Sequence, residues 1–227
     1  MKQELLDKIA EINTFIADYR ASKVLDPDAD EALNFCYKHY HAILIWQNSI
    51  DNDVSEANEI KLYLNEATAD LSSAVLCSLL HLYKPSRMTL RSSIENLMRV
   101  VVLLDKRAAL SAKSTYELSV LFNSGNLLTN KIISNSVQSC LRKYDKLCKY
   151  VHTSTPMHMD HRIPFAELTK PIKKEFIDCL NDTGEICQDL NKFLFFLKSN
   201  LILSMHHRES DYILDRLPRK LKTLQLK

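Results

Sequence analysis

Glycine is almost absent from this sequence. The 227 residues include only two glycines, Gly125 and Gly184. Loops that bind nucleotide phosphates need several glycines where the backbone approaches the ligand. A P-loop, a dinucleotide-binding fingerprint and a kinase-type glycine-rich loop are therefore excluded. Folds built from many β-hairpins also depend on glycine turns, so the composition favours an almost entirely helical protein.

The sequence also lacks CxxC pairs, a signal peptide, membrane-spanning runs and a large net charge, and each absence excludes a class of protein. The six cysteines include no CxxC pair, which favours reduced, buried thiols in a cytoplasmic protein. The N-terminus mixes acidic with apolar residues and does not resemble a signal peptide. The longest apolar runs, around residues 100–104 and 194–197, are too short to span a membrane. A net charge of +2 is too small to predict nucleic-acid binding by itself, so any basic surface must be local.

Apolar residues recur at helical spacing along nearly the whole chain. Hydrophobic residues make up 46% and charged residues 26%, enough apolar side chains for a core. The pattern predicts an all-α fold, a single helical bundle of six to eight helices in one domain over residues 1–227. The expected helices cover about 2–20, 30–50, 55–83, 86–104, 114–125, 136–152 and 171–205, and a charged, basic C-terminal tail follows over 206–227.

Local signals suggest where these helices begin and bend. Ser55 and Ser86 are expected to cap the N-termini of the third and fourth helices. Ser114 and Glu117 have the spacing of a capping box. Gly184 lies inside the last long helix and is the expected position of a kink. Residues 153–170 have little periodicity and are expected to form a long loop.

The helix expected over residues 136–152 carries the residue types of greatest chemical interest. Its apolar stripe consists of Val137, Leu141, Tyr144, Cys148 and Val151. Asp145 and His152 lie close together along one edge of that stripe, and Arg142, Lys146 and Lys149 lie slightly further round. A titratable histidine beside cations suits phosphodiester chemistry or anion binding. The same pattern also describes an ordinary amphipathic helix with a histidine at its boundary.

Two short motifs together resemble the HEPN superfamily. They are Arg91-Ser92-Ser93-Ile94-Glu95 and, later, Tyr144-x-x-Leu147-Cys148-x-x-Val151-His152. The resemblance covers roughly residues 60–155, within a HEPN-like core over about 55–205. It implies an up-and-down helical bundle that pairs as a homodimer. It also implies a metal-independent ribonuclease or toxin of a defence or toxin–antitoxin system, with RNA as substrate and an antitoxin or defence-system protein as partner.

The resemblance also implies roles for individual residues. His152 would act as general acid or base while a 2′-OH attacks the adjacent phosphate, and Lys146, Lys149 or Arg91 would offset the developing charge. Asp145 lies about 10 Å from His152 along the helix axis, so it would orient an imidazole only across a dimer. Arg142, Glu95 and Tyr144 complete the expected substrate-binding set. No metal and no cofactor are expected.

The spacing of the motif leaves a second hypothesis open. Active HEPN proteins have an arginine four to six residues before the histidine, whereas nine residues separate Arg142 from His152. Lys146 has suitable spacing but lacks the planar, bidentate grip of arginine on phosphate. Arg91 and Glu95 also fit a simple i,i+4 ion pair, and His152 fits a helix C-cap. The alternative is therefore a non-catalytic HEPN-like interaction protein that binds a protein partner, a nucleotide or RNA.

The long loop contains a histidine-containing segment with some features of a metal site. His158 and His161, with Asp160 between them, have the residue types of metal ligands. Three candidate ligands without a fourth anchor elsewhere are a weak signal, and a solvated loop is favoured.

Overall fold

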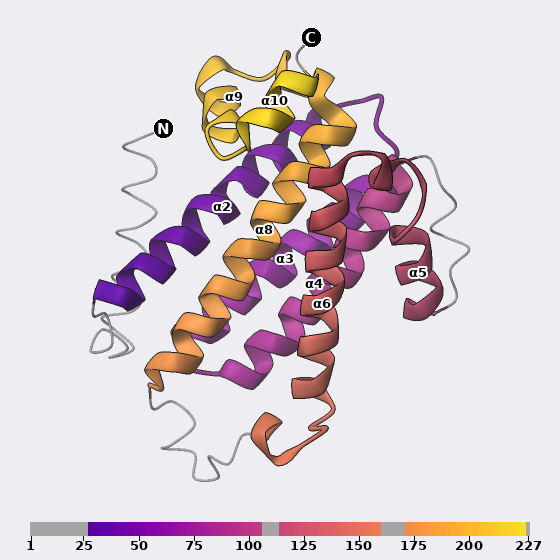
Figure 1. Ribbon diagram of the computed structural model, residues 1–227. Helices are drawn as coiled ribbons and strands as arrows, with labels where there is room; N and C mark the ends of the chain where they lie inside the picture. The colour runs from indigo at the N-terminus through magenta and orange to yellow at the C-terminus, as the bar shows by residue number, and fades with distance from the viewer. Residues whose placement is uncertain (1–26, 106–113, 160–170, 226–227) are drawn as a thin grey trace.

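The computed structural model describes residues 27–105, 114–159 and 171–225 (Figure 1). Within these ranges the chain forms eight α-helices, two short 3-10 helices and no strand, which confirms the predicted all-α bundle. The elements are α2 (Pro27–Asn52), α3 (Asn58–Leu79), α4 (Tyr83–Leu104), α5 (Thr115–Phe122), η3 (Gly125–Thr129), α6 (Lys131–Val151), η4 (Pro156–His158), α8 (Lys173–Ile202), α9 (His207–Leu214) and α10 (Arg219–Gln225). The helix predicted over residues 2–20 lies outside the described residues.

Helices α3 and α4 form an antiparallel hairpin, joined by a turn in which His81 has a φ of 60°. The predicted caps at Ser55 and Ser86 are wrong. Ser55 bonds to Asp53 through its backbone nitrogen and its hydroxyl, three residues before α3 begins. Ser86 lies inside α4, where its hydroxyl donates to the carbonyl of Ala74 at 2.9 Å and so ties the two helices together.

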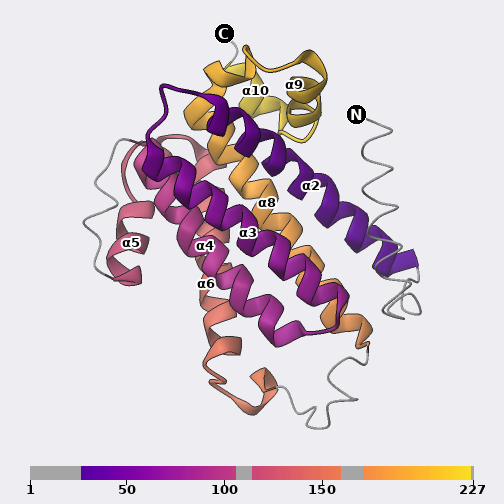
Figure 2. The same ribbon diagram turned by 180° about the vertical axis from the view of Figure 1, so that it is seen from behind.

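Helices α2 and α8 pack along their lengths, and Figure 2 shows both beside α3. Gly184 permits this approach, because a Cβ atom there would lie 2.6 Å from the ring of Phe35. Trp46 is fully buried between the helices and donates to the side-chain oxygen of Asn191 at 2.7 Å. The predicted kink at Gly184 is wrong, since the non-helical backbone of α8 lies at Lys198.

Helix α6 lies against α4 and α8 and begins five residues before its predicted start. The side chain of Asn130 caps it by accepting from the backbone nitrogens of Ile132 and Ile133. Its inner face buries Ile133, Val137, Cys140, Tyr144 and Leu147 in the main core. The predicted stripe on this helix is therefore the surface that holds it to the bundle.

The C-terminal segment, expected as a charged tail, packs against the bundle instead. It folds into α9 and α10, with Pro218 separating them, and it covers one end of the bundle (Figure 1). Its apolar residues Tyr212, Ile213, Leu217 and Leu221 join the main core. The hydroxyl of Tyr212 donates to the backbone carbonyl of Lys38 on α2 at 3.2 Å.

The cysteines are free thiols, and most of them are buried. All six cysteines are free, and four of them, Cys36, Cys140, Cys179 and Cys187, are buried. Burial raises the pKa of Cys36 to about 12 and that of Cys179 to about 11, which keeps both thiols protonated. None of the described helices combines the length and the apolar character needed to cross a bilayer.

Candidate functional site

The two motifs of the HEPN resemblance meet in the contact between α4 and α6. Arg91 pairs with Glu95 at 2.9 Å, one turn further along α4. The hydroxyl of Tyr144 accepts from Arg91 at 3.0 Å and donates to Glu95 at 2.9 Å, which closes a three-residue ring. Arg91 also donates through Nε to the sulfur of Cys148 at 3.2 Å. The network thus joins residues of α4 to residues of α6 that lie 49 or more positions away in the sequence.

This network keeps the Tyr144 hydroxyl protonated and the Arg91 guanidinium charged. Burial raises the pKa of Tyr144, and the contact with Glu95 adds to that effect, so the hydroxyl stays protonated and can donate. Burial alone would lower the pKa of Arg91, but its bonds to Cys148 and Tyr144 and the charge of Glu95 outweigh burial and raise it. The guanidinium is therefore permanently charged and already occupied. Within this chain it serves the α4–α6 contact rather than an open phosphate site.

Lys146 is also engaged inside the chain. Its ammonium contacts the carboxylate of Asp182 on α8 at 2.7 Å. Burial lowers the pKa of Lys146, but the hydrogen bond and the charge of Asp182 outweigh that effect and raise it. The Lys146 side chain remains 45% exposed, so a ligand could reach it only in competition with Asp182.

Four of the predicted site residues share the exposed face of α6: Arg142, Asp145, Lys149 and His152. None of the four makes a side-chain hydrogen bond or ion pair with another described residue. His152 is the C-cap of α6, and its backbone nitrogen donates to the carbonyl of Cys148 at 2.9 Å. Thr153 follows with a φ of 45°, so the chain turns away directly after the histidine. The imidazole is accessible beside Lys149, one turn earlier.

The end of α6 meets the beginnings of α4 and α8. Arg87 is buried and forms an ion pair with Glu175 on α8, while its guanidinium lies 4.0 Å from the ring centre of Tyr150 on α6. The hydroxyl of Tyr83 accepts from the backbone nitrogen of Ile172 at 2.9 Å, which brings the starts of α4 and α8 together.

Exposed lysines lie on both α6 and α8 at this end. Lys149 and Lys174 are exposed, and neither pairs with an acid in the part of the chain that the structure describes. Arg87 lies beneath them. The N-termini of α4 and α8 also lie at this end, and the positive ends of their helix dipoles favour anions there.

The histidine-containing segment shows a structural contact. The ring of His158 packs edge-on against Tyr150 with centres 4.8 Å apart, and its Nδ1 lies 2.6 Å from the hydroxyl of Thr155. Asp160 and His161 lie outside the described residues. Among those that are described, no group of three histidine, cysteine or acidic side chains is placed to hold a metal ion.

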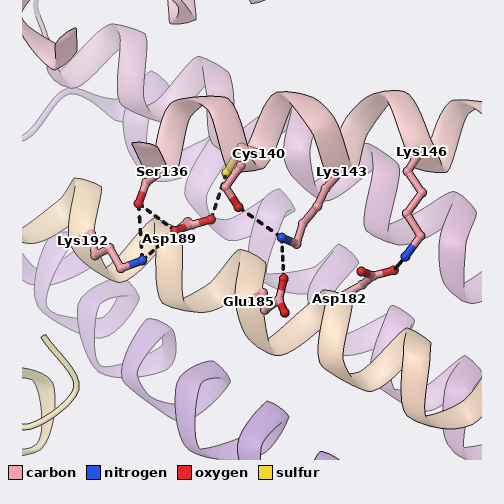
Figure 3. A network of polar contacts seen from close by, with 9 residues as sticks. Ser136, Cys140, Lys143, Lys146, Asp182, Glu185, Asp189 and Lys192 are labelled. Atoms are coloured by element: carbon pink, nitrogen blue, oxygen red, sulfur yellow. Dashed lines mark hydrogen bonds and ion pairs between the residues drawn. The ribbon is translucent and has the colours of Figure 1, made fainter. Parts of the chain in front are cut away.

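A second set of polar contacts connects α6 with α8 (Figure 3). Lys143 pairs with Glu185 at 2.5 Å, and the buried Asp189 accepts from Ser136 at 2.7 Å and from Lys192 at 2.8 Å. None of these contacts was predicted from the sequence. The available signal was the spacing of Asp182, Glu185 and Asp189, which places three carboxylates on one face of α8.

No protein family, no curated protein and no solved structure matches this chain. The HEPN resemblance therefore stays a prediction, carried by the two sequence motifs.

Proposed function

We propose that this chain is a HEPN-like, metal-independent ribonuclease or toxin of a defence or toxin–antitoxin type system. It would act in the cytoplasm as a homodimer. The observation that carries the proposal is the position of His152, an accessible imidazole one turn from the exposed Lys149, with no side-chain partner among the described residues. A general acid–base residue must be free to exchange a proton with its substrate, and this histidine meets that requirement.

In the proposed reaction the 2′-OH of one nucleotide attacks the adjacent phosphorus. One His152 imidazole of the dimer removes the 2′-OH proton, the partner copy's protonated imidazole donates a proton to the 5′-oxygen as the bond from phosphorus to that oxygen breaks, and a 2′,3′-cyclic phosphate forms. Lys149 lies one turn from His152 and would offset charge on the phosphorane. Lys149 replaces Arg91 and Lys146 in this role, because carboxylates of the same chain already neutralise both of those cations. Arg142 would contact the RNA backbone further along α6.

The second candidate is a non-catalytic HEPN-like interaction protein. The pairing of Arg91 with Glu95 and of Lys146 with Asp182 favours it, since both groups expected to grip a phosphate are engaged elsewhere. The exposed face of α6 would then be a contact surface. It carries Asp145 between Arg142 and Lys149, a mixed charge pattern that suits a protein partner better than RNA.

Cleavage of an end-labelled RNA by purified variants separates the two candidates. His152→Ala should reduce the rate at least about a hundredfold, the size expected for an acid–base residue, and should stay folded. His207→Ala is the matched control, because His207 is an exposed histidine on α9. Lys149→Ala should weaken cleavage, whereas Lys146→Ala should weaken it less. A chelator should change nothing. If the wild-type protein does not cut RNA, the ribonuclease proposal is wrong and the interaction protein is the remaining candidate.

A further inference from the structure

The outward face of α3 is apolar, and none of the described elements covers it. Leu62 is 68% exposed and Leu76 is 44% exposed, and neither belongs to a hydrophobic core cluster of the described residues. Ala69 is also exposed and lies on the same face, seven residues from each leucine. Figure 2 shows α3 on the near side of the bundle with no described helix in front of it. The three residues form an apolar stripe about 21 Å long, counted at about 1.5 Å per residue.

This stripe lacks the charges of an ordinary solvent-facing helix surface. Charged residues make up 26% of the chain, yet the second half of α3, from Leu71 to Leu79, contains none. Among the exposed residues between Leu62 and Leu76, only Glu66 is charged. The outward face of a surface helix normally carries charged and polar residues, and an exposed apolar face marks a place where another surface packs.

The chain enters α2 beside one end of this stripe. Ala29 and Ala32, near the start of α2, share a core cluster with Leu79 at the end of α3. The 26 residues before Pro27 lie outside the described residues, and their sequence predicts an amphipathic helix over about 2–20. The six residues that follow this segment can span up to about 20 Å, enough to reach from the start of α2 to the neighbouring helix. A helix of this length extends about 28 Å and so matches the stripe.

The apolar residues of this N-terminal segment repeat with the spacing of the α3 face. They are Leu5, Ile9, Ile12, Ile16 and Tyr19. Leu5, Ile12 and Tyr19 are seven residues apart, as are Leu62, Ala69 and Leu76. A helix that runs parallel to α3 brings these two sets level, with the large Ile12 opposite the small Ala69. In the same register Lys8 lies within one residue of the level of Glu66, so that its ammonium can pair with the one charge on the face.

We propose that residues 2–20 pack as a helix along the outward face of α3, with Ile12 opposite Ala69. The short connection to α2 holds the segment near this face at an effective concentration of about a millimolar, which a second copy of the chain at micromolar concentration does not match. Figures 1 and 2 show α6 and α3 on opposite sides of the bundle. The inference is therefore independent of the ribonuclease proposal and holds whether or not the chain cleaves RNA.

Disulfide trapping in the full chain tests this register. Ile12→Cys combined with Ala69→Cys should form an intrachain disulfide in oxidised glutathione at least about tenfold faster than Ile12→Cys combined with Val54→Cys, because trapping requires the two Cβ atoms to meet. Val54 is the matched control, since it is 99% exposed and lies just before α3. Peptide mapping by mass spectrometry identifies the bond. Trapping at residue 69 that is no faster than at residue 54, or a disulfide between two chains, overturns the proposal.

Hydrogen exchange in the full chain measures the docking without new cysteines. Leu62→Asp combined with Leu76→Asp places two charges in the stripe, so the amides of residues 5–19 should exchange at least about tenfold faster than in wild type. Exchange in α6 should not change, because both leucines lie outside the core clusters. Leu203→Asp is the control, since Leu203 is 80% exposed at the end of α8, and it should leave the segment as protected as in wild type. Unprotected amides over residues 5–19 in wild type, or protection that survives the double variant, overturns the proposal.

Discussion

Replacing Tyr144 with phenylalanine removes one oxygen atom from the contact between α4 and α6 and leaves the ring in place. That oxygen accepts from Arg91 and donates to Glu95. Hydrogen bonds to charged groups contribute about 1.5–3 kcal/mol each when they are fully buried. Here the two charged side chains are 26% and 24% exposed, and their own ion pair remains in the variant. Water and the ion pair offset part of the loss, so we expect destabilisation of about 1–2 kcal/mol.

Urea unfolding followed by circular dichroism measures this loss. Tyr116→Phe is the matched control, because Tyr116 is 77% exposed on α5, and its free energy of unfolding should change by less than about 0.5 kcal/mol. A double-mutant cycle with Glu95→Gln should show that the two positions are coupled. Tyr144→Phe should keep any RNA cleavage, since the network holds the helices together. A variant as stable as wild type, with no coupling to Glu95, would refute the reasoning.

Three further predictions concern the core. Gly184→Ala should destabilise by about 1–3 kcal/mol in urea unfolding, because its Cβ would overlap the Phe35 ring; equal or higher stability would contradict the α2–α8 packing. The pKa of His39 is lowered from 6.5 to about 4, first by burial, so stability should fall as the pH drops below about 6.5, by about 2 kcal/mol at pH 5. His39→Gln should lose this dependence when unfolding is compared at pH 7.5 and 5, and an unchanged dependence would assign it to other groups. A thiol reagent should modify the half-buried Cys77 and Cys148 first and all six cysteines after unfolding without reductant; fewer than six would indicate a disulfide.

Long amphipathic helices could be predicted because their signal is local. The stripe on α6 and the helices α3 and α4 follow from helical periodicity alone. The predicted cap at Ser114 is confirmed, since its hydroxyl accepts from the backbone nitrogen of Glu117 at 3.1 Å, but the caps at Ser55 and Ser86 are wrong, because a serine hydroxyl also finds other partners. Ser86 bonds to the carbonyl of Ala74 on the neighbouring helix, so the same residue that would start a helix lies within one.

The contacts of the candidate site also fall into local contacts, which the sequence predicts, and long-range contacts, which it does not. The pairing of Arg91 with Glu95 is an i,i+4 contact that the sequence contains directly. Tyr144 joins that pair from 49 residues away, and Lys146 meets Asp182 across 36 residues. Only the packing of α4, α6 and α8 decides which partner each charge finds. The sequence therefore predicted accessible positions such as His152 without revealing which cations were already neutralised.

The central claim is that His152 promotes attack by a 2′-OH. The most direct measurement is cleavage by the wild-type chain and by His152→Ala of two oligonucleotides, one of RNA and one of DNA with the same sequence, in the presence of a chelator. The account predicts that wild type cuts the RNA to a 2′,3′-cyclic phosphate, leaves the DNA intact, and loses activity at least about a hundredfold in the folded variant. Cleavage of both the RNA and the DNA oligonucleotide, no cleavage of the RNA, or a fully active His152→Ala variant would contradict it.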